Sequence, residues 1–485
     1  MNVEFKNIFK NTGIIGLSQV ILIIVTVIRS KITALLLGSE GMGIIYLISN
    51  SLGVIGTITN LGFGTIALKN IAKAHLNDGQ NKIPVLIRHY QIVSWITGLF
   101  GLFLTIILAY FLSIYVFNSE NYVLEFIFLS STVLMAQINT GYFTALQGLQ
   151  KFKLLAYSNI VAGIISLLFA FLIMFFLEKS GIILLVFSYS LIPMLISIGY
   201  FRRLNINKTK INVGYIKVLF VDLIKNGTII SLTRFLPLLI SMILFYVLTK
   251  FGSNKIVGLY SAGFSIIFNY ANLLFNSMES EYFTRINKYK SNEELKNAVG
   301  FQTELIISFI SPIIIFFIIF IDDILILLYS REFLDINQMM KIAIVGLLFK
   351  GLSWPLNYLY LIDNKTKKYF TIELASNLVL LILNIIFFIK FDLLGLGYSF
   401  LFSQILISLI LFYLVAKDFK INISRRLLSY LFIQFLLCSL TLLISISDYF
   451  SSINYWLFLI CIFYNIWYLN KTIKFRDLAF KVYSK

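Results

Sequence analysis

Four basic residues lie inside long apolar stretches of this chain, where an ionised side chain is costly. They are Arg29, Lys31, Arg234 and Lys350. Guanidinium and ammonium groups bind phosphate and carboxylate oxygens through charge-assisted hydrogen bonds. Within an apolar layer, such groups usually face the interior of a helix bundle or a water-filled cavity. The sequence therefore predicts that these cations bind an anionic group inside a bundle of helices.

The depth of each cation follows from a helix rise of about 1.5 Å per residue. Arg234 lies about 12 Å into its apolar stretch, and Lys350 lies near the middle of another. Arg29 and Lys31 lie about 25 Å or more along the first stretch. The four cations thus form a series across the apolar layer. Snorkelling of the side chains to nearby headgroups is the alternative, and it is stronger for Arg29 and Lys31 than for the deeper pair.

Three acidic residues lie near apolar stretches. Glu125 and Glu304 are within a turn of stretch ends, so we expect both at a membrane interface. Glu373 begins a stretch close to Lys367 and Lys368. Structural pairing and coupling to a transported ion are both open for Glu373.

Amide side chains also occur within the apolar stretches. Such groups form hydrogen bonds between helices or line a hydrated cavity, and the sequence does not separate the two roles. They are Asn50, Asn60, Gln137, Asn139, Asn269, Asn272, Asn276, Asn357, Asn377 and Asn384.

Residues suited to covalent or metal chemistry are few. His75 and His89 lie in or beside a basic connection, and we expect solvent around both. Cys438 and Cys461 lie mid-stretch and are expected to pack as small apolar side chains. No metal-ligand spacing, nucleophile elbow or Walker A sequence occurs. We therefore expect no enzymatic activity, no bound metal and no cofactor.

The elements that position these groups are about fourteen apolar stretches, each long enough to cross a bilayer. A spanning helix needs about 20 apolar residues, and the 485 residues are 59% hydrophobic and 13% charged, with a mean hydropathy of +0.90. The sequence predicts an all-α polytopic membrane protein. The expected spans are 12–36, 43–66, 90–113, 123–147, 154–177, 180–201, 226–249, 257–278, 300–321, 342–362, 370–389, 394–415, 427–447 and 452–470.

The net charge of +18 is distributed unevenly over the connections between these spans. Every second connection, counted from the N-terminus, is basic, and together these hold 30 Lys and Arg residues against six in the others. Cytoplasmic loops are enriched in Lys and Arg. This distribution explains the charge better than binding to nucleic acid does, and it predicts cytoplasmic termini.

A faint repeat predicts two pseudo-symmetric halves. Residues 10–17 align with residues 225–232 at an offset of 215. Both copies open a span that enters from the cytoplasm, and parallel repeats occur in some transporters. The domains we expect are a six-helix bundle over 1–201, a basic cytoplasmic linker with an interfacial helix over 202–225, a second six-helix bundle over 226–415, and two further transmembrane helices with a basic tail over 416–485.

Several segments, in the expected order, resemble the Wzx-type polysaccharide flippases. This family belongs to the MOP superfamily, together with MATE exporters and lipid II flippases. Lys31 and Lys350 match basic positions of such families, whereas Arg29 and Arg234 match none. The first span lacks the acid that is prominent in many MATE exporters. The segments are 31–46, 60–72, 327–333, 345–350 and 368–373.

The resemblance implies a flippase of the bacterial inner membrane. Its substrate would be an undecaprenyl-diphosphate-linked oligosaccharide, carried from the cytoplasmic to the outer leaflet for O-antigen, capsule or related glycan synthesis. Membrane lipids, a coupling ion (H⁺ or Na⁺) and a glycan polymerase would be its partners. The two bundles would rock alternately, and hairpins at 38–43 and 252–258 would close the outer side.

Two other functions are weighed against this one. A MATE-like antiporter of cationic molecules would need acids, not cations, facing its cleft. A lipid-sugar polymerase or ligase would need a large outer catalytic loop, and the longest outer connection, 322–341, has only twenty residues.

The charge distribution makes the topology testable. A reporter fused after Lys485 is expected in the cytoplasm and one inserted near Asp335 outside, because basic loops are retained on the cytoplasmic side. Reporter activity and cysteine accessibility measure on which side of the membrane each of the two positions lies. Labelling of residues 202–225 from the periplasm would overturn the arrangement.

Overall fold

The structure is a computed structural model in which the chain is almost entirely helical. It describes residues 3–76, 83–117, 119–206, 209–286, 292–362, 365–421, 424–447 and 451–483. No strand occurs in these ranges. The described chain packs into two compact units, one of Met1–Gly258 with Leu328–Ser330, the other of Leu259–Leu327 with Arg331–Lys485.

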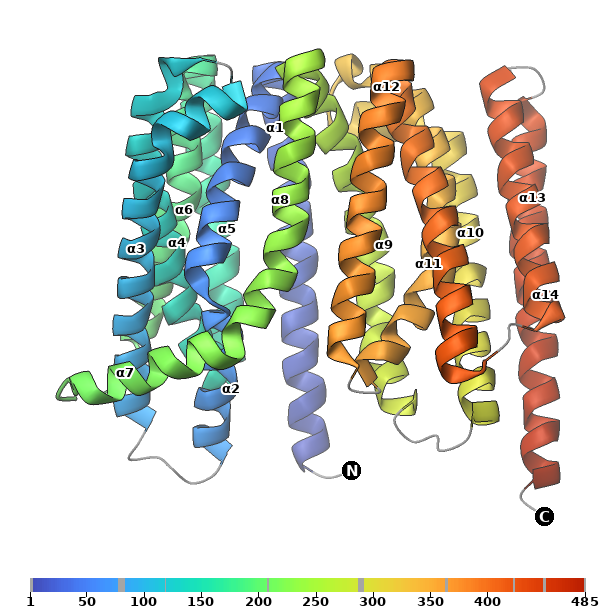
Figure 1. The fold of residues 1–485 in the computed structure, drawn as a ribbon, viewed down its shortest axis with the longest axis horizontal. Helices are drawn as coiled ribbons and strands as arrows, with labels where there is room; N and C mark the ends of the chain where they lie inside the picture. Colours follow the sequence, from blue (N-terminus) through green and yellow to red (C-terminus); the bar gives the residue numbers. More distant parts are fainter. Residues whose placement is uncertain are drawn as a thin grey trace. The chain divides into compact units, whose positions relative to one another are not determined.

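The helices of the first unit are shown in blue to green in Figure 1. They are α1 (Val3–Asn60), α2 (Phe63–Leu76), α3 (Ile83–Phe117), α4 (Val123–Gly148), α5 (Phe152–Leu177), α6 (Ile182–Arg202), α7 (Val213–Asp222), α8 (Thr228–Phe251) and the beginning of α9 (Asn254–Ile286). The second unit holds the rest of α9, then α10 (Asn292–Leu328), α11 (Asn337–Ile362), α12 (Thr366–Phe419), α13 (Arg425–Ser447) and α14 (Ser451–Tyr483).

The number of membrane crossings agrees with the fourteen predicted. Among the described residues, ten helical stretches are long and apolar enough to span a bilayer. Three of these are 43 to 53 residues long and cross twice, because each is interrupted near its middle. The interruptions are at Gly38 (φ 67°), at the 3₁₀ turn Glu178–Gly181 and at Asp392 (φ 52°). Counting these three twice and adding the 33-residue helix α9 gives fourteen long helical segments in the described ranges, and the predicted polytopic membrane fold is confirmed.

The second span ends earlier than predicted. Helix α1 stops at Asn60, because Leu61 and Gly62 both adopt positive φ angles, of 49° and 69°. A left-handed residue commonly ends a helix, and Gly adopts it without steric cost. The chain then restarts as the separate helix α2.

The helix α7 forms where the sequence predicts an interfacial helix. Figure 1 shows it crossing the ends of its neighbours at a steep angle. Leu219, and Leu223 in the π-helical turn that follows, are buried against α2 and α3, whereas Val218 and Val221 are exposed. A helix with two such apolar edges fits the boundary between headgroups and acyl chains.

The expectation that solvent surrounds His89 is wrong. Its side chain is fully buried, because α3 begins at Ile83, ahead of the predicted span, and α7 covers it. The backbone N–H of Asn212 donates to His89 Nε2 at 2.9 Å, and His89 Nδ1 lies 2.6 Å from the carbonyl oxygen of Val85. This histidine therefore fixes the start of α7 on α3.

Glu304, which the sequence places near a membrane interface, is buried between helices. Its side chain is 6% exposed and accepts a hydrogen bond from the Tyr468 hydroxyl at 2.8 Å. Arg426 lies 3.8 Å from the same carboxylate. Deeper between the same helices, Asn465 donates to the Ser308 carbonyl at 3.1 Å and accepts from Tyr430. Polar pairs of this kind hold α13 and α14 against α10, where no water competes.

The second half of α1 lies along α8, and backbones come very close at both ends of this contact, at the start of α9 and in the π-helical turn before α8. A Cβ on Gly43 would strike the Asn254 carbonyl, and one on Gly258 would strike the Ser39 carbonyl. At the opposite end, Gly62 and Gly227 meet backbone to backbone. Between these ends, Ser231 donates to the Thr57 carbonyl at 2.5 Å and Asn50 to the Leu238 carbonyl at 3.3 Å. We call this the glycine seam.

Adding a methyl group to the glycine seam is expected to destabilise the protein. Gly43→Ala and Gly258→Ala place a Cβ against backbone atoms that cannot rotate away, and overpacking of this kind costs about 1–3 kcal/mol. Gly199→Ala is the control, because nothing lies within 4 Å of its added Cβ. Thermal unfolding in detergent measures the change. Equal melting temperatures for the three variants would contradict the close approach.

Candidate functional site

Lys350 lies in α11, and aromatic rings from α9 surround its ammonium group. Its Nζ lies 4.8 Å from the ring centroid of Phe268 and 5.9 Å from that of Phe275. Aromatic faces attract cations, more strongly where water is excluded. Among the described residues, no side chain or carbonyl accepts a hydrogen bond from this ammonium group. An ammonium group has three N–H donors with which it can bind an anion.

Glu373, in the first half of α12, faces the same region. Its carboxylate interacts electrostatically with Lys350, and the Asn357 amide donates to it at 2.5 Å. The Oδ1 atom of Asn357 is buried and has no hydrogen-bond partner in the described part of the chain. The structure thus brings two of the five predicted site residues together, with an amide between α11 and α12.

A second carboxylate, Glu279, was missed by the sequence analysis. It is half-buried in α9 and forms a hydrogen bond with the hydroxyl of Tyr358. The hydroxyl of Tyr369 interacts electrostatically with both Glu279 and Glu373. The predicted span ended at residue 278, whereas α9 continues to Ile286. The signal in the sequence was the absence of any Gly or Pro between the apolar run and this acid.

Aromatic packing sets the spacing of these helices. Trp354 stacks on Phe275 with centroids 5.6 Å apart and packs against Tyr358 at 4.5 Å. The hydroxyl of Tyr282 donates to the Pro355 carbonyl at 2.8 Å. Stacked rings and this hydrogen bond hold α9 against α11, and so fix the positions of Lys350 and its neighbours.

The other three predicted cations lie in the first unit. The guanidinium of Arg29 stacks over the Tyr189 ring at 4.7 Å, between α1 and α6. Arg234 is exposed on α8, and its Nη2 donates to the Thr65 hydroxyl at 3.2 Å. Lys31 is half-buried, two residues after Arg29, and residues two apart do not face each other on a helix. Anion binding by each of the four cations stays a prediction.

Several of the membrane amides have partners on other helices. Asn60 donates to Gln137 at 2.6 Å, and Gln137 donates to the Gly56 carbonyl at 2.8 Å. Asn384 accepts a hydrogen bond from Ser399 across the α12 hairpin. By contrast, Asn269 and Asn272 are exposed on α9. The side chain of Asn276 lies outside the described residues.

The arrangement in the second unit is suited to ion binding rather than to covalent chemistry. One ammonium group can bind an anion, and two carboxylates can hold a cation or a proton. The charges are close enough to influence one another. Occupation of one site therefore changes the electrostatic field at the other.

A family model described as polysaccharide biosynthesis protein matches residues 8–280, which is more than half of the chain. The chain belongs to this family. The match runs from α1 almost to the end of α9, and it includes the glycine seam. No curated protein matches the chain significantly.

Solved structures show that the chain shares the fold of MOP superfamily transporters. An inward-facing multidrug resistance MATE family transporter has a TM-score of 0.68 at 13% identity, covering 83% of this chain and 94% of its own. The lipid II flippase MurJ, in an inward closed conformation, has a TM-score of 0.66 at 14% identity, covering 96% and 99%. A MOP superfamily transporter from Pyrococcus furiosus has a TM-score of 0.56 at 14% identity, covering 83% and 95%. The resemblance seen in the sequence is confirmed at the level of family and fold.

The solved structures cover different shares of this chain. The lipid II flippase covers 96% of the chain and the MATE transporter 83%. Residues 416–485, which hold α13 and α14, make up a seventh of the sequence.

The hydrogen bond between Asn357 and Glu373 can be tested in this protein. Asn357→Leu leaves a half-buried carboxylate without its donor, which costs about 1–3 kcal/mol. Glu373→Gln keeps an acceptor oxygen and is expected to change the unfolding temperature less. Asn377→Leu is the control, because among the described residues that amide donates to the Glu373 carbonyl of its own helix. If Asn357→Leu unfolds at the control's temperature, the pairing has no structural role.

Proposed function

We propose that this protein is a flippase for an undecaprenyl-diphosphate-linked oligosaccharide. The observation that carries the proposal is the ammonium group of Lys350, which lacks an acceptor among the described residues. A diphosphate offers several anionic oxygens to such a donor. The prenyl tail can remain in lipid while the headgroup passes through, so no covalent step is needed.

The proposed membrane is the bacterial inner membrane, with both termini in the cytoplasm. Thirty of the 36 loop cations then lie on the cytoplasmic side. The glycan would be an O-antigen, capsule or related unit. A coupling ion at Glu373 and Glu279, and a glycan polymerase as partner, belong to the same proposal.

The hairpins at 38–43 and 252–258 are proposed to close the outer side. Their backbones are in contact through Gly43 and Gly258, which supports a state closed at that end. The lipid II flippase to which the fold is similar is also in an inward closed conformation. Export would require these hairpins to separate, since a cleft sealed at one end must open there to release its substrate.

A MATE-like cation antiporter is the second candidate. It is favoured by one observation, that Glu279 and Glu373 lie in the same region as the aromatic residues Tyr358 and Trp354. Carboxylates beside aromatic faces suit an organic cation. Against it stands Lys350, whose charge would repel such a ligand.

Substitution of the cations distinguishes the two candidates. Lys350→Ala and Arg234→Ala are each expected to abolish glycan export at unchanged protein level, because the diphosphate loses a charged donor. Lys350→Arg is expected to retain part of the activity, since Arg and Lys are imperfect substitutes. Lys179→Ala is the control, because Lys179 is 58% exposed in an ion pair with Glu40.

The readout is the amount of lipid-linked glycan that accumulates in the inner leaflet. Normal export by the Lys350→Ala, Arg234→Ala double variant would rule out the diphosphate-binding role. Export of cationic drugs that is enhanced by Lys350→Ala would favour the antiporter.

A further inference from the structure

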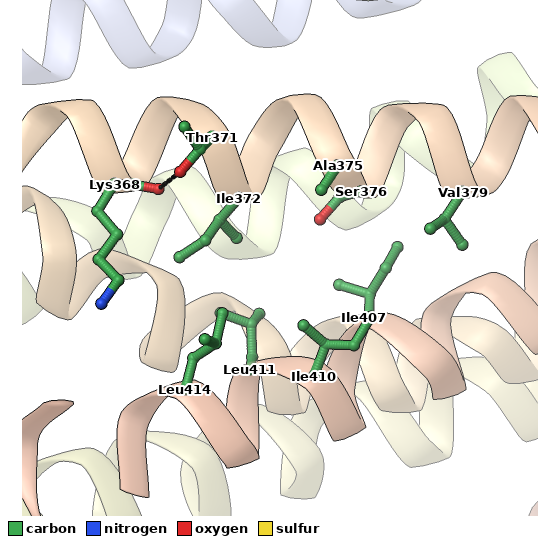
Figure 2. A pocket seen from close by; sticks show the side chains of 10 residues that line it. All are labelled: Lys368, Thr371, Ile372, Ala375, Ser376, Val379, Ile407, Ile410, Leu411 and Leu414. Atoms are coloured by element: carbon green, nitrogen blue, oxygen red, sulfur yellow. Dashed lines mark hydrogen bonds between the residues drawn. The ribbon is translucent and has the colours of Figure 1, made fainter. Parts of the chain in front are cut away.

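A groove of about 250 Å³ runs between the two halves of α12, in the second unit. Figure 2 shows side chains from both halves facing it. Its walls are apolar except for Lys368, Thr371 and Ser376. The apolar residues are Ile372, Ala375 and Val379 on the first half and Ile407, Ile410, Leu411 and Leu414 on the second.

The hollow arises from small side chains on one wall. Ala375 and Ser376 face branched residues across the groove and cannot fill the space between the helices (Figure 2). An empty space in a packed structure loses dispersion contacts on every side. In a membrane, the molecule available to fill it is a lipid chain.

The length of the groove matches one leaflet. Lys368 and Val379 mark its two ends along the first half of α12, eleven positions apart. At a rise of about 1.5 Å per residue this is roughly 17 Å, against about 15 Å for half of the hydrocarbon core. A lipid chain that enters at the Lys368 end would therefore reach the bilayer centre.

The Lys368 end of the groove is strongly basic. Lys368 forms an ion pair with Asp418, which also accepts a hydrogen bond from Tyr360 at 2.8 Å. This ion pair holds Lys368 at the open end of the groove, which we call the mouth, and the negative charge of Asp418 is compensated there. Lys367 and Lys417 remain exposed on the same end of the hairpin. Basic clusters at the ends of membrane-spanning helices attract anionic lipid headgroups.

We infer that this groove binds one acyl chain of an anionic phospholipid, whose phosphate lies against Lys368 and its basic neighbours. The positive charge at the mouth favours an anionic headgroup, and the length of the groove matches an acyl chain that extends through one leaflet. A polyprenyl tail is the weaker candidate, because a groove that ends at mid-bilayer holds only part of it. This inference is independent of the transported substrate.

Native mass spectrometry of the purified full-length protein tests the lipid class. The delipidated protein is mixed with phosphatidylglycerol or with phosphatidylcholine of identical chains. Retention of phosphatidylglycerol is expected to exceed that of phosphatidylcholine by about tenfold, because lysines near the phosphate favour the anionic headgroup. Equal retention of the two lipids would overturn the inference.

A groove-filling variant tests the location. Ala375→Trp is expected to remove the retained phosphatidylglycerol, because the indole occupies the space of the chain. Leu378→Trp is the matched control, since Leu378 is 43% exposed on the same helix and does not line the groove. Undiminished retention by a folded Ala375→Trp protein would place the lipid elsewhere.

The charge at the mouth provides a variant that does not disturb packing. Lys367→Gln with Lys417→Gln is expected to lower the preference for phosphatidylglycerol over phosphatidylcholine several-fold. An unchanged preference would contradict the role of the basic end. Displacement of bound phosphatidylglycerol by an equimolar amount of undecaprenyl phosphate would overturn the phospholipid assignment in favour of a prenyl chain.

Discussion

The absence of water from the hydrocarbon layer is the constraint on which this structure depends. A polar group there must find its partner within the protein. Asn60 binds Gln137, Asn465 binds the Ser308 carbonyl, and Glu304 binds Tyr468. Each pair joins two helices that apolar side chains alone would not hold in register, since lipid solvates apolar surfaces equally well. The fold is therefore specified by polar pairs inside an apolar assembly.

Against that background, the groups that lack partners carry information about function. Lys350 has aromatic neighbours but no acceptor, and Asn357 Oδ1 has no donor, among the described residues. Both are on α11, within two turns of each other. Glu373 lies beside them and Glu279 is linked to it through Tyr369. Polar groups that lack partners, and that destabilise the fold for this reason, are thus gathered in one region of the second unit. This is common at sites where a ligand supplies the missing contacts.

The sequence predicted the helices well and their pairings poorly. Every predicted span lies largely on a helix, because hydropathy depends only on local composition. The end of α1 at Asn60 could not be predicted, since it depends on the left-handed Leu61 and on the approach of Gly227. Solvent was expected around His89, and the partners that bury His89 and Glu304 are distant in sequence: Asn212 lies 123 positions from His89, and Tyr468 lies 164 positions from Glu304. Such partners leave no local signal.

The glycine seam has a consequence for how the protein is made. It joins α1 to α8 and to the start of α9, and the first unit extends to Gly258 with only Leu328–Ser330 added from further along the chain. During synthesis, α1 is therefore made long before its partners, because more than two hundred residues of the chain precede Gly227 and Gly258. Until then the glycines at 43 and 62 lack the backbone segments that they contact in the folded protein. Biogenesis, as well as transport, thus constrains these four glycines.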